Sequence, residues 1–151
     1  MKLFDYIEEL MDGGVKGLYD EKTYFVHQIK DINELKEVTE GDERRAVVCD
    51  SGLYVMAVTN WQVFHWQLWK FLKSKGLVEG SGLNESDISY DHDIDKYMTL
   101  MIYDNDAWIG ESYNSECVAQ MKKKNTKIGK AYSKWKNKLS GMGITLMDDS
   151  L

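Results

Sequence analysis

Proline is absent from this 151-residue sequence, and cysteine occurs only twice. Without proline, no turn or helix start depends on a fixed backbone angle. Cys49 and Cys117 lie far apart without CxxC or metal-ligand spacing, so we expect reduced thiols in a cytoplasmic protein. No apolar run approaches membrane-spanning length, and the acidic, interrupted N-terminus does not resemble a signal peptide. We therefore expect no membrane partner.

Motifs that carry catalysis or hold a cofactor are also missing from the sequence. The three histidines show no metal-ligand spacing, and no glycine-rich phosphate loop or Ser/His/Asp set can be assembled. The acidic run Asp91–Asp95 alternates oxygen ligands as a calcium loop does, but Lys96 stands where such a loop needs glycine. We expect no catalytic residue, no metal site and no cofactor. An enzyme that uses this run with a divalent metal is the last of the hypotheses.

Charge is distributed unevenly along a chain whose net charge is −6. Residues 1–121 hold 11 basic and 23 acidic side chains, whereas residues 122–151 hold eight lysines against Asp148 and Asp149. An acidic body repels a long polyanion, which argues against general coating of nucleic acid. A local anion site in the basic C-terminal segment remains open.

Apolar periodicity and turn residues predict hairpins separated by helices. The clearest hairpin pairs Arg44–Cys49 with Leu53–Thr59 across a turn of Asp, Ser and Gly. A helix follows at Asn60–Gly76, and the acidic stretch 77–95 is expected to be a loop or insertion. The other helices expected are Lys2–Asp12, Ile32–Val38, one capped by Asn114 or Ser115 that ends at Met121, and one capped by Thr126 that ends at Leu139. The other strands expected are Val15–Tyr19, Thr23–Ile29, Lys96–Tyr103, Ala107–Tyr113 and Ile144–Met147.

These elements predict a single α+β domain over residues 1–151. Strands joined by short turns pair antiparallel, so successive β-hairpin–helix units would build an antiparallel sheet of about six strands. Helices placed between hairpins would then lie mainly on one face of that sheet. The identity between the units is too low for a sequence repeat, so they share architecture alone.

The helix expected at Asn60–Gly76 holds three of the five tryptophans. At about 100° per residue, one apolar face points to the core, and a second face carries Trp66, Trp69, Lys70 and Lys73. Two indoles beside two lysines suit a stacked base whose phosphate meets the amines, and they equally suit a protein contact. The alternative is a helix buried on both sides, by the sheet and by another helix.

The helix expected to end at Leu139 is amphipathic. Besides its apolar stripe, it has a basic stripe at spacings of three and four, formed by Lys127, Lys130, Lys134 and Lys138. The run Lys122–Lys124 lengthens this basic track. Such a stripe suits a phosphate backbone or an acidic protein, and the alternative is a row of solvated lysines that only confers solubility.

The lack of proline, together with abundant Lys, Asn and Tyr, resembles the composition of accessory proteins of AT-rich phages and mobile elements. That resemblance implies an inhibitor of a host enzyme or defence factor, or a toxin-neutralising immunity protein. We therefore expect a non-catalytic binding protein that docks on another protein, with contacts at Trp66, Trp69, Asp91 and Asp93. The alternative function is a nucleotide or nucleic-acid binder that uses Trp66, Trp69 and the lysine stripe.

Overall fold

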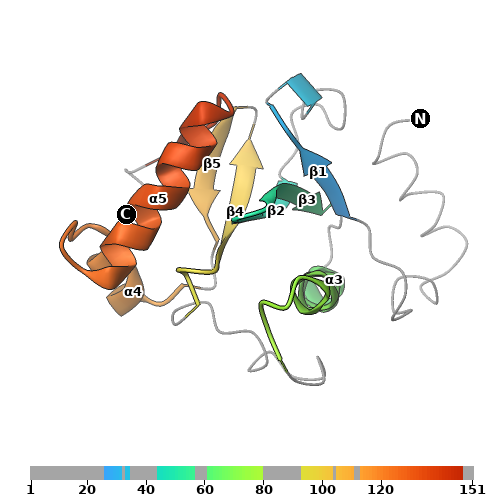
Figure 1. The fold of residues 1–151 in the computed structure, drawn as a ribbon, viewed down its shortest axis with the longest axis horizontal. Coiled ribbons are helices and arrows are strands. Elements are labelled where there is room, and N and C mark those ends of the chain that lie inside the picture. The colour runs from blue at the N-terminus through green and yellow to red at the C-terminus, as the bar shows by residue number, and fades with distance from the viewer. Residues whose placement is uncertain are drawn as a thin grey trace, which may run out of the picture.

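The computed structural model describes residues 26–31, 33–34, 44–56, 61–79, 93–103, 105–110 and 113–147. Within these ranges the chain forms an α+β fold with one six-stranded sheet and three helices of defined bounds (Figure 1). The strands are β1 (Val26–Ile29), β2 (Arg44–Cys49), β3 (Gly52–Met56), β4 (Tyr97–Tyr103), β5 (Asp106–Ile109) and β6 (Thr145–Leu146). The helices are α3 (Trp61–Ser74), α4 (Ser115–Met121) and α5 (Lys127–Gly141).

The sheet has the strand order β1-β3-β2-β4-β5-β6. Strands β2 and β3 form a tight hairpin in which Cys49 pairs with Gly52, and β4 and β5 form a second hairpin. In the middle of the sheet the two hairpins meet, where β2 runs antiparallel to β4 with Ala46 opposite Leu100. Both hairpins expected from the sequence in this part of the chain are confirmed.

The last strand departs from the antiparallel pattern. Strand β6 pairs with β5 in parallel, with Asp106 opposite Thr145. The connection between these strands is the pair of helices α4 and α5, and a parallel neighbour requires such a long crossover instead of a turn. The sheet is therefore mostly antiparallel, and the prediction of a purely antiparallel sheet is corrected at this edge.

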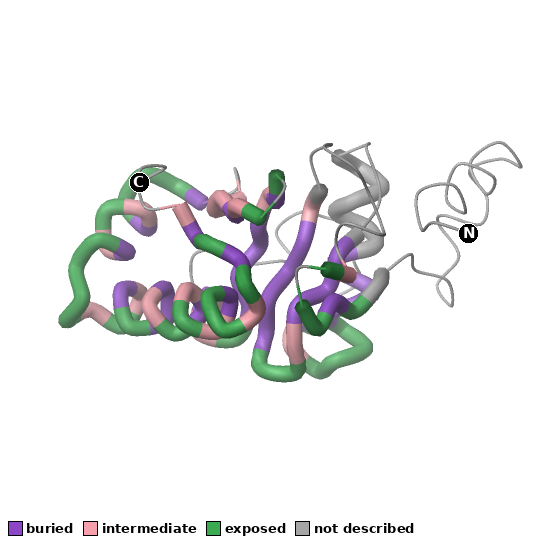
Figure 2. Tube along the Cα trace, turned by 90° about the horizontal axis from the view of Figure 1, so that it is seen from above, coloured by how far each residue is buried: buried purple, intermediate pink, exposed green. Residues whose placement is uncertain are grey.

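Helices cover both faces of the sheet. Ala46 and Val48 of β2 belong to the main core cluster with the residues of α5. Val47, between them, points to the other face and is also buried, beside its partner Tyr54 on β3. Helix α3 packs on that second face, where the ring centroid of Phe71 lies 4.5 Å from that of Tyr54. The prediction that the helices lie mainly on one face is corrected for α3, because the central strands are apolar on both sides (Figures 1 and 2).

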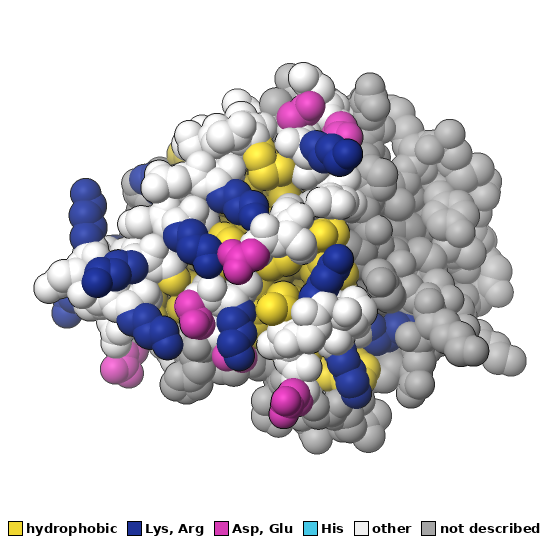
Figure 3. All heavy atoms as spheres, viewed as in Figure 1, with side chains coloured by type: hydrophobic (Ala, Val, Ile, Leu, Met, Phe, Trp, Pro, Cys, Tyr) yellow, Lys and Arg dark blue, Asp and Glu magenta, His cyan; other side chains and the backbone are white. Residues whose placement is uncertain are grey.

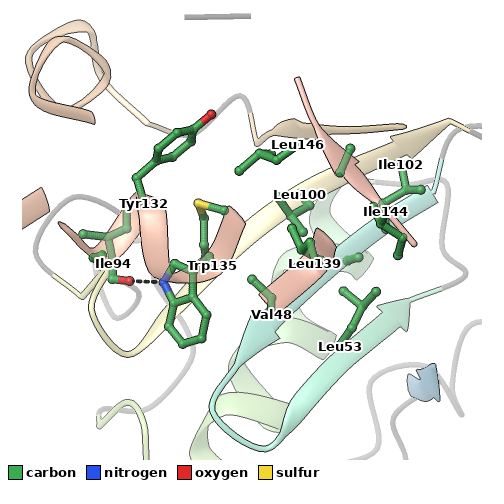
Figure 4. Close-up of a cluster of buried hydrophobic side chains, with 14 of the residues drawn as sticks. Val48, Leu53, Ile94, Leu100, Ile102, Tyr132, Trp135, Leu139, Ile144 and Leu146 are labelled. Carbon is green, nitrogen blue, oxygen red and sulfur yellow. Dashed lines mark hydrogen bonds between the residues drawn. The ribbon is translucent and has the colours of Figure 1, made fainter. Parts of the chain in front are cut away.

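The main core lies between the sheet and α5 (Figure 4). Trp135 is fully buried there, and its indole Nε1 donates a hydrogen bond of 2.6 Å to the carbonyl oxygen of Ile94. One turn later, Leu139 points toward Leu100 and Val48, on the two strands that form the middle of the sheet. The apolar stripe expected on this helix is therefore its core face.

Side chains cap the helices at the expected positions. The Asn114 side chain accepts a hydrogen bond of 2.8 Å from the backbone N–H of Cys117. Thr126 Oγ1 accepts one of 2.9 Å from the N–H of Gly129. Both bonds satisfy an N–H that has no partner inside its helix. Helix α3 ends just before Gly76, whose φ of +71° glycine adopts without strain.

Several element ends differ from the prediction, and β6 spans only Thr145–Leu146 of the expected Ile144–Met147. Strand β5 stops at Ile109, before Tyr113, whose hydroxyl instead accepts a hydrogen bond of 3.0 Å from the backbone N–H of Thr99. The Tyr113 hydroxyl thus gives the backbone N–H of Thr99 in β4 a hydrogen-bond partner past the point where β5 ends. At the other end of this region, α5 continues past Leu139 to Gly141.

Some expectations fall outside the described residues. They are the helix Lys2–Asp12, the strand Val15–Tyr19, most of the helix Ile32–Val38, the cap Asn60 and the stretch 80–92. On either side of that stretch, residues 77–79 and 93–96 form turns or irregular backbone. A loop over the whole of 77–95 stays a prediction, as does a single domain over the whole chain.

Candidate functional site

Two of the four aromatic and basic residues singled out on α3 are not accessible. Trp69 and Lys70 are buried, with 6% and 5% of their surface exposed. Lys73 is exposed, and its Nζ lies 4.7 Å from the centroid of the Trp69 ring. The side chain of Trp66 lies outside the described part of the structure. Buried side chains offer little area to a partner, so Trp69 and Lys70 do not carry the proposal made below.

Of the two aspartates expected to contact a partner, Asp91 lies outside the described residues and Asp93 is half-buried. The Asp93 carboxylate lies 3.6 Å from Nζ of Lys96. Its carbonyl oxygen accepts hydrogen bonds from the N–H groups of Lys96 and Tyr97, at 2.8 and 3.1 Å. Asp93 therefore closes the turn that leads into β4. Among the described residues, no group of three side chains is arranged to hold a metal ion.

Helix α3 and the lysine-bearing helix α5 lie on opposite faces of the sheet. Trp69 is on the side where Phe71 packs against Tyr54, and the lysine stripe is on the helix whose core face holds Trp135. Trp69 and the lysine stripe, expected to act together on a nucleic acid, are thus separated by the sheet.

The lysine stripe itself is largely engaged with the fold. Lys134 Nζ lies 3.0 Å from the carboxylate of Asp50, in the turn between β2 and β3. Lys138 Nζ donates hydrogen bonds to the carbonyl oxygens of Cys49 and Asp50, at 2.8 and 2.5 Å. Lys127 makes a longer contact of 3.8 Å with a carboxylate just ahead of β4. These three lysines link α5 to the strands and turns of the sheet, and Lys130 is the stripe lysine that makes no such contact with a described residue.

A second group of lysines is exposed and makes no ion pair with a described carboxylate. This group, which we name the basic patch, consists of Lys122, Lys123, Lys124 and Lys130. Over residues 122–147 the sequence has eight lysines and no acidic residue. Lysine side chains gather over the left of the face drawn in Figure 3, the side on which Figure 1 places α4 and α5.

The loop that carries three of these lysines is held firmly against α5. The hydroxyl of Thr126 lies within hydrogen-bond distance of the carbonyl oxygens of Lys123 and Gln120, at 2.8 and 3.0 Å. A Cβ added to Gly129 would lie 1.9 Å from the Lys123 oxygen, so only glycine lets the loop approach the helix this closely. Lys123 is thereby placed beside the first turn of α5, next to Lys130.

A hollow with a volume of about 580 Å³ lies between this loop and α5. We name it the basic hollow, and its lining residues are Met121, Lys122, Lys124, Tyr132, Ser133, Lys136 and Asn137. Among the described residues the lining contains three lysines and no carboxylate, while Met121 and Tyr132 are almost fully buried. At about 100° per residue, its α5 residues lie on one flank of the helix, and the lysines that contact the sheet, Lys127, Lys134 and Lys138, lie on the other. The hollow is therefore separate from the ion pairs that hold α5 to the sheet.

Sequence reasoning missed the hollow. By helical spacing Tyr132 falls within the apolar stripe of this helix, and Lys136 falls in neither stripe. The available signal was their spacing, because residues four apart lie on the same flank of a helix, beside the lysine run that precedes it. Only the folded-back loop shows that Lys122 and Lys124 face that flank.

Neither the described helices nor similarity to other proteins narrows the function further. No helix in the described ranges is long and apolar enough to cross a membrane. Comparison of the chain with protein-family models, with curated proteins and with solved structures gave no match.

Proposed function

We propose that this chain is a non-catalytic binding protein that docks on an acidic surface of another protein through the basic patch. The observation that carries the proposal is the exposure of four lysines that no described carboxylate neutralises, in a chain that is acidic elsewhere. Lysines that serve only the fold, such as Lys134 and Lys138, are engaged with the β2–β3 turn. Within the described ranges, no comparable contact holds the side chains of the patch lysines.

The charge distribution favours a protein partner over a long nucleic acid. Residues 1–121 carry an excess of 12 negative charges, 23 acidic against 11 basic side chains, and would repel an extended phosphate backbone. A small basic patch on an acidic body instead suits a partner with a local acidic patch. Such complementarity raises the association rate and fixes the orientation of the complex.

Docking of this kind is how an inhibitor of a host enzyme or defence factor acts, and also how an immunity protein neutralises a toxin. These are the partner classes implied by the resemblance of the chain, in composition, to accessory proteins of AT-rich phages and mobile elements. Cys49 and Cys117 are both buried free thiols, which supports a cytoplasmic location.

Charge reversal at the patch tests the proposal. The test variant is Lys123→Glu/Lys130→Glu, and the matched control is Lys30→Glu/Lys96→Glu, which reverses two exposed lysines outside the patch. Each protein is used to capture partners from a nuclease-treated lysate of the source organism. We expect wild type and control to retain one stoichiometric protein. A photocrosslinking residue introduced at position 123 of this chain should attach to an acidic region of that protein. We expect the test variant to lose at least about nine-tenths of that protein.

Retention of the partner by the patch variant would place the contact elsewhere. Material that is captured from untreated lysate and lost from the nuclease-treated lysate would show that the ligand is a nucleic acid. Binding through charge also has to weaken as salt is raised, because exposed charges are screened within about 8 Å at physiological ionic strength.

A further inference from the structure

We draw no further inference here: the strongest candidate, the patch of Met101, Trp108 and Tyr103 on the face of the β4–β5 hairpin turned away from α5, carries nothing, because nothing in the described part of the structure shows what covers that face.

Discussion

Replacing Gly129 by alanine tests how closely the basic loop packs against α5. Helix propensity alone predicts that this change stabilises the protein, because alanine is favoured over glycine in a helix interior by about 1 kcal/mol. In this fold, however, the added Cβ would lie 1.9 Å from the carbonyl oxygen of Lys123, where real contacts are not shorter than 3.0 Å. The oxygen would have to retreat by about 1.1 Å, which is the difference between those two distances.

The oxygen that must move is a backbone atom that also bonds to the Thr126 hydroxyl. Backbone cannot swing away as the end of a long side chain can, and overpacking of this kind costs about 1–3 kcal/mol, with a further 1 kcal/mol or so for a disturbed cap. These costs exceed the gain in propensity. When the gain in helix propensity is subtracted from the costs of overpacking and of the disturbed cap, Gly129→Ala should lower the free energy of unfolding by about 2 kcal/mol.

Gly141, in the same helix, provides the matched control. A Cβ there would meet nothing within 4 Å, so Gly141→Ala keeps only the propensity gain and should raise the stability by about 0.5 kcal/mol at this helix end. Urea unfolding followed by tryptophan fluorescence measures both variants, and equal slopes against urea make their midpoints comparable. If Gly129→Ala proved as stable as wild type or more so, the loop would not lie as close to the helix as the structure has it.

Two further substitutions test buried polar groups on either side of the sheet. Trp135→Phe removes the hydrogen bond to Ile94 and leaves a buried carbonyl oxygen unsatisfied. The unsatisfied acceptor and the lost side-chain volume together should lower the free energy of unfolding by about 2–4 kcal/mol, measured by thermal unfolding. A loss below about 1 kcal/mol would contradict the role given to this bond. Thr99→Val replaces a buried hydroxyl that has no hydrogen-bond partner in the described structure with a methyl group of similar shape. We expect the stability to be unchanged or raised by up to about 1 kcal/mol in urea unfolding, and a clear loss would reveal a partner for that hydroxyl.

Features that depend on neighbours in the sequence were predicted well. The turn after Cys49, the caps Asn114 and Thr126 and the stop at Gly76 all result from bonds or backbone angles within a few residues. Local chemistry of this kind is visible in the sequence, because the residue types that can provide it are few.

Features that depend on distant segments were not predictable in the same way. Val47 and Val48 are both buried, so β2 has no alternation to show that each face of the sheet needs its own helix. The partners of Lys138 are carbonyl oxygens 88 and 89 positions away in the sequence, and nothing near Lys138 indicates them. The stripe was therefore visible, while its engagement with the β2–β3 turn was not.

The pairing of β2 with β4 has a consequence for how the chain reaches this fold. Each hairpin needs only local contacts and can form within about 1–10 μs, whereas pairing Ala46 with Leu100 closes a loop over the whole of residues 46–100. Contacts so distant in the sequence slow folding, because the entropy of loop closure is lost before the contacts are gained. The joining of the two hairpins should therefore limit the folding rate, and shortening the stretch 80–92 should accelerate it. Until that step is complete, α5 has no assembled sheet on which to bury Trp135 and Leu139.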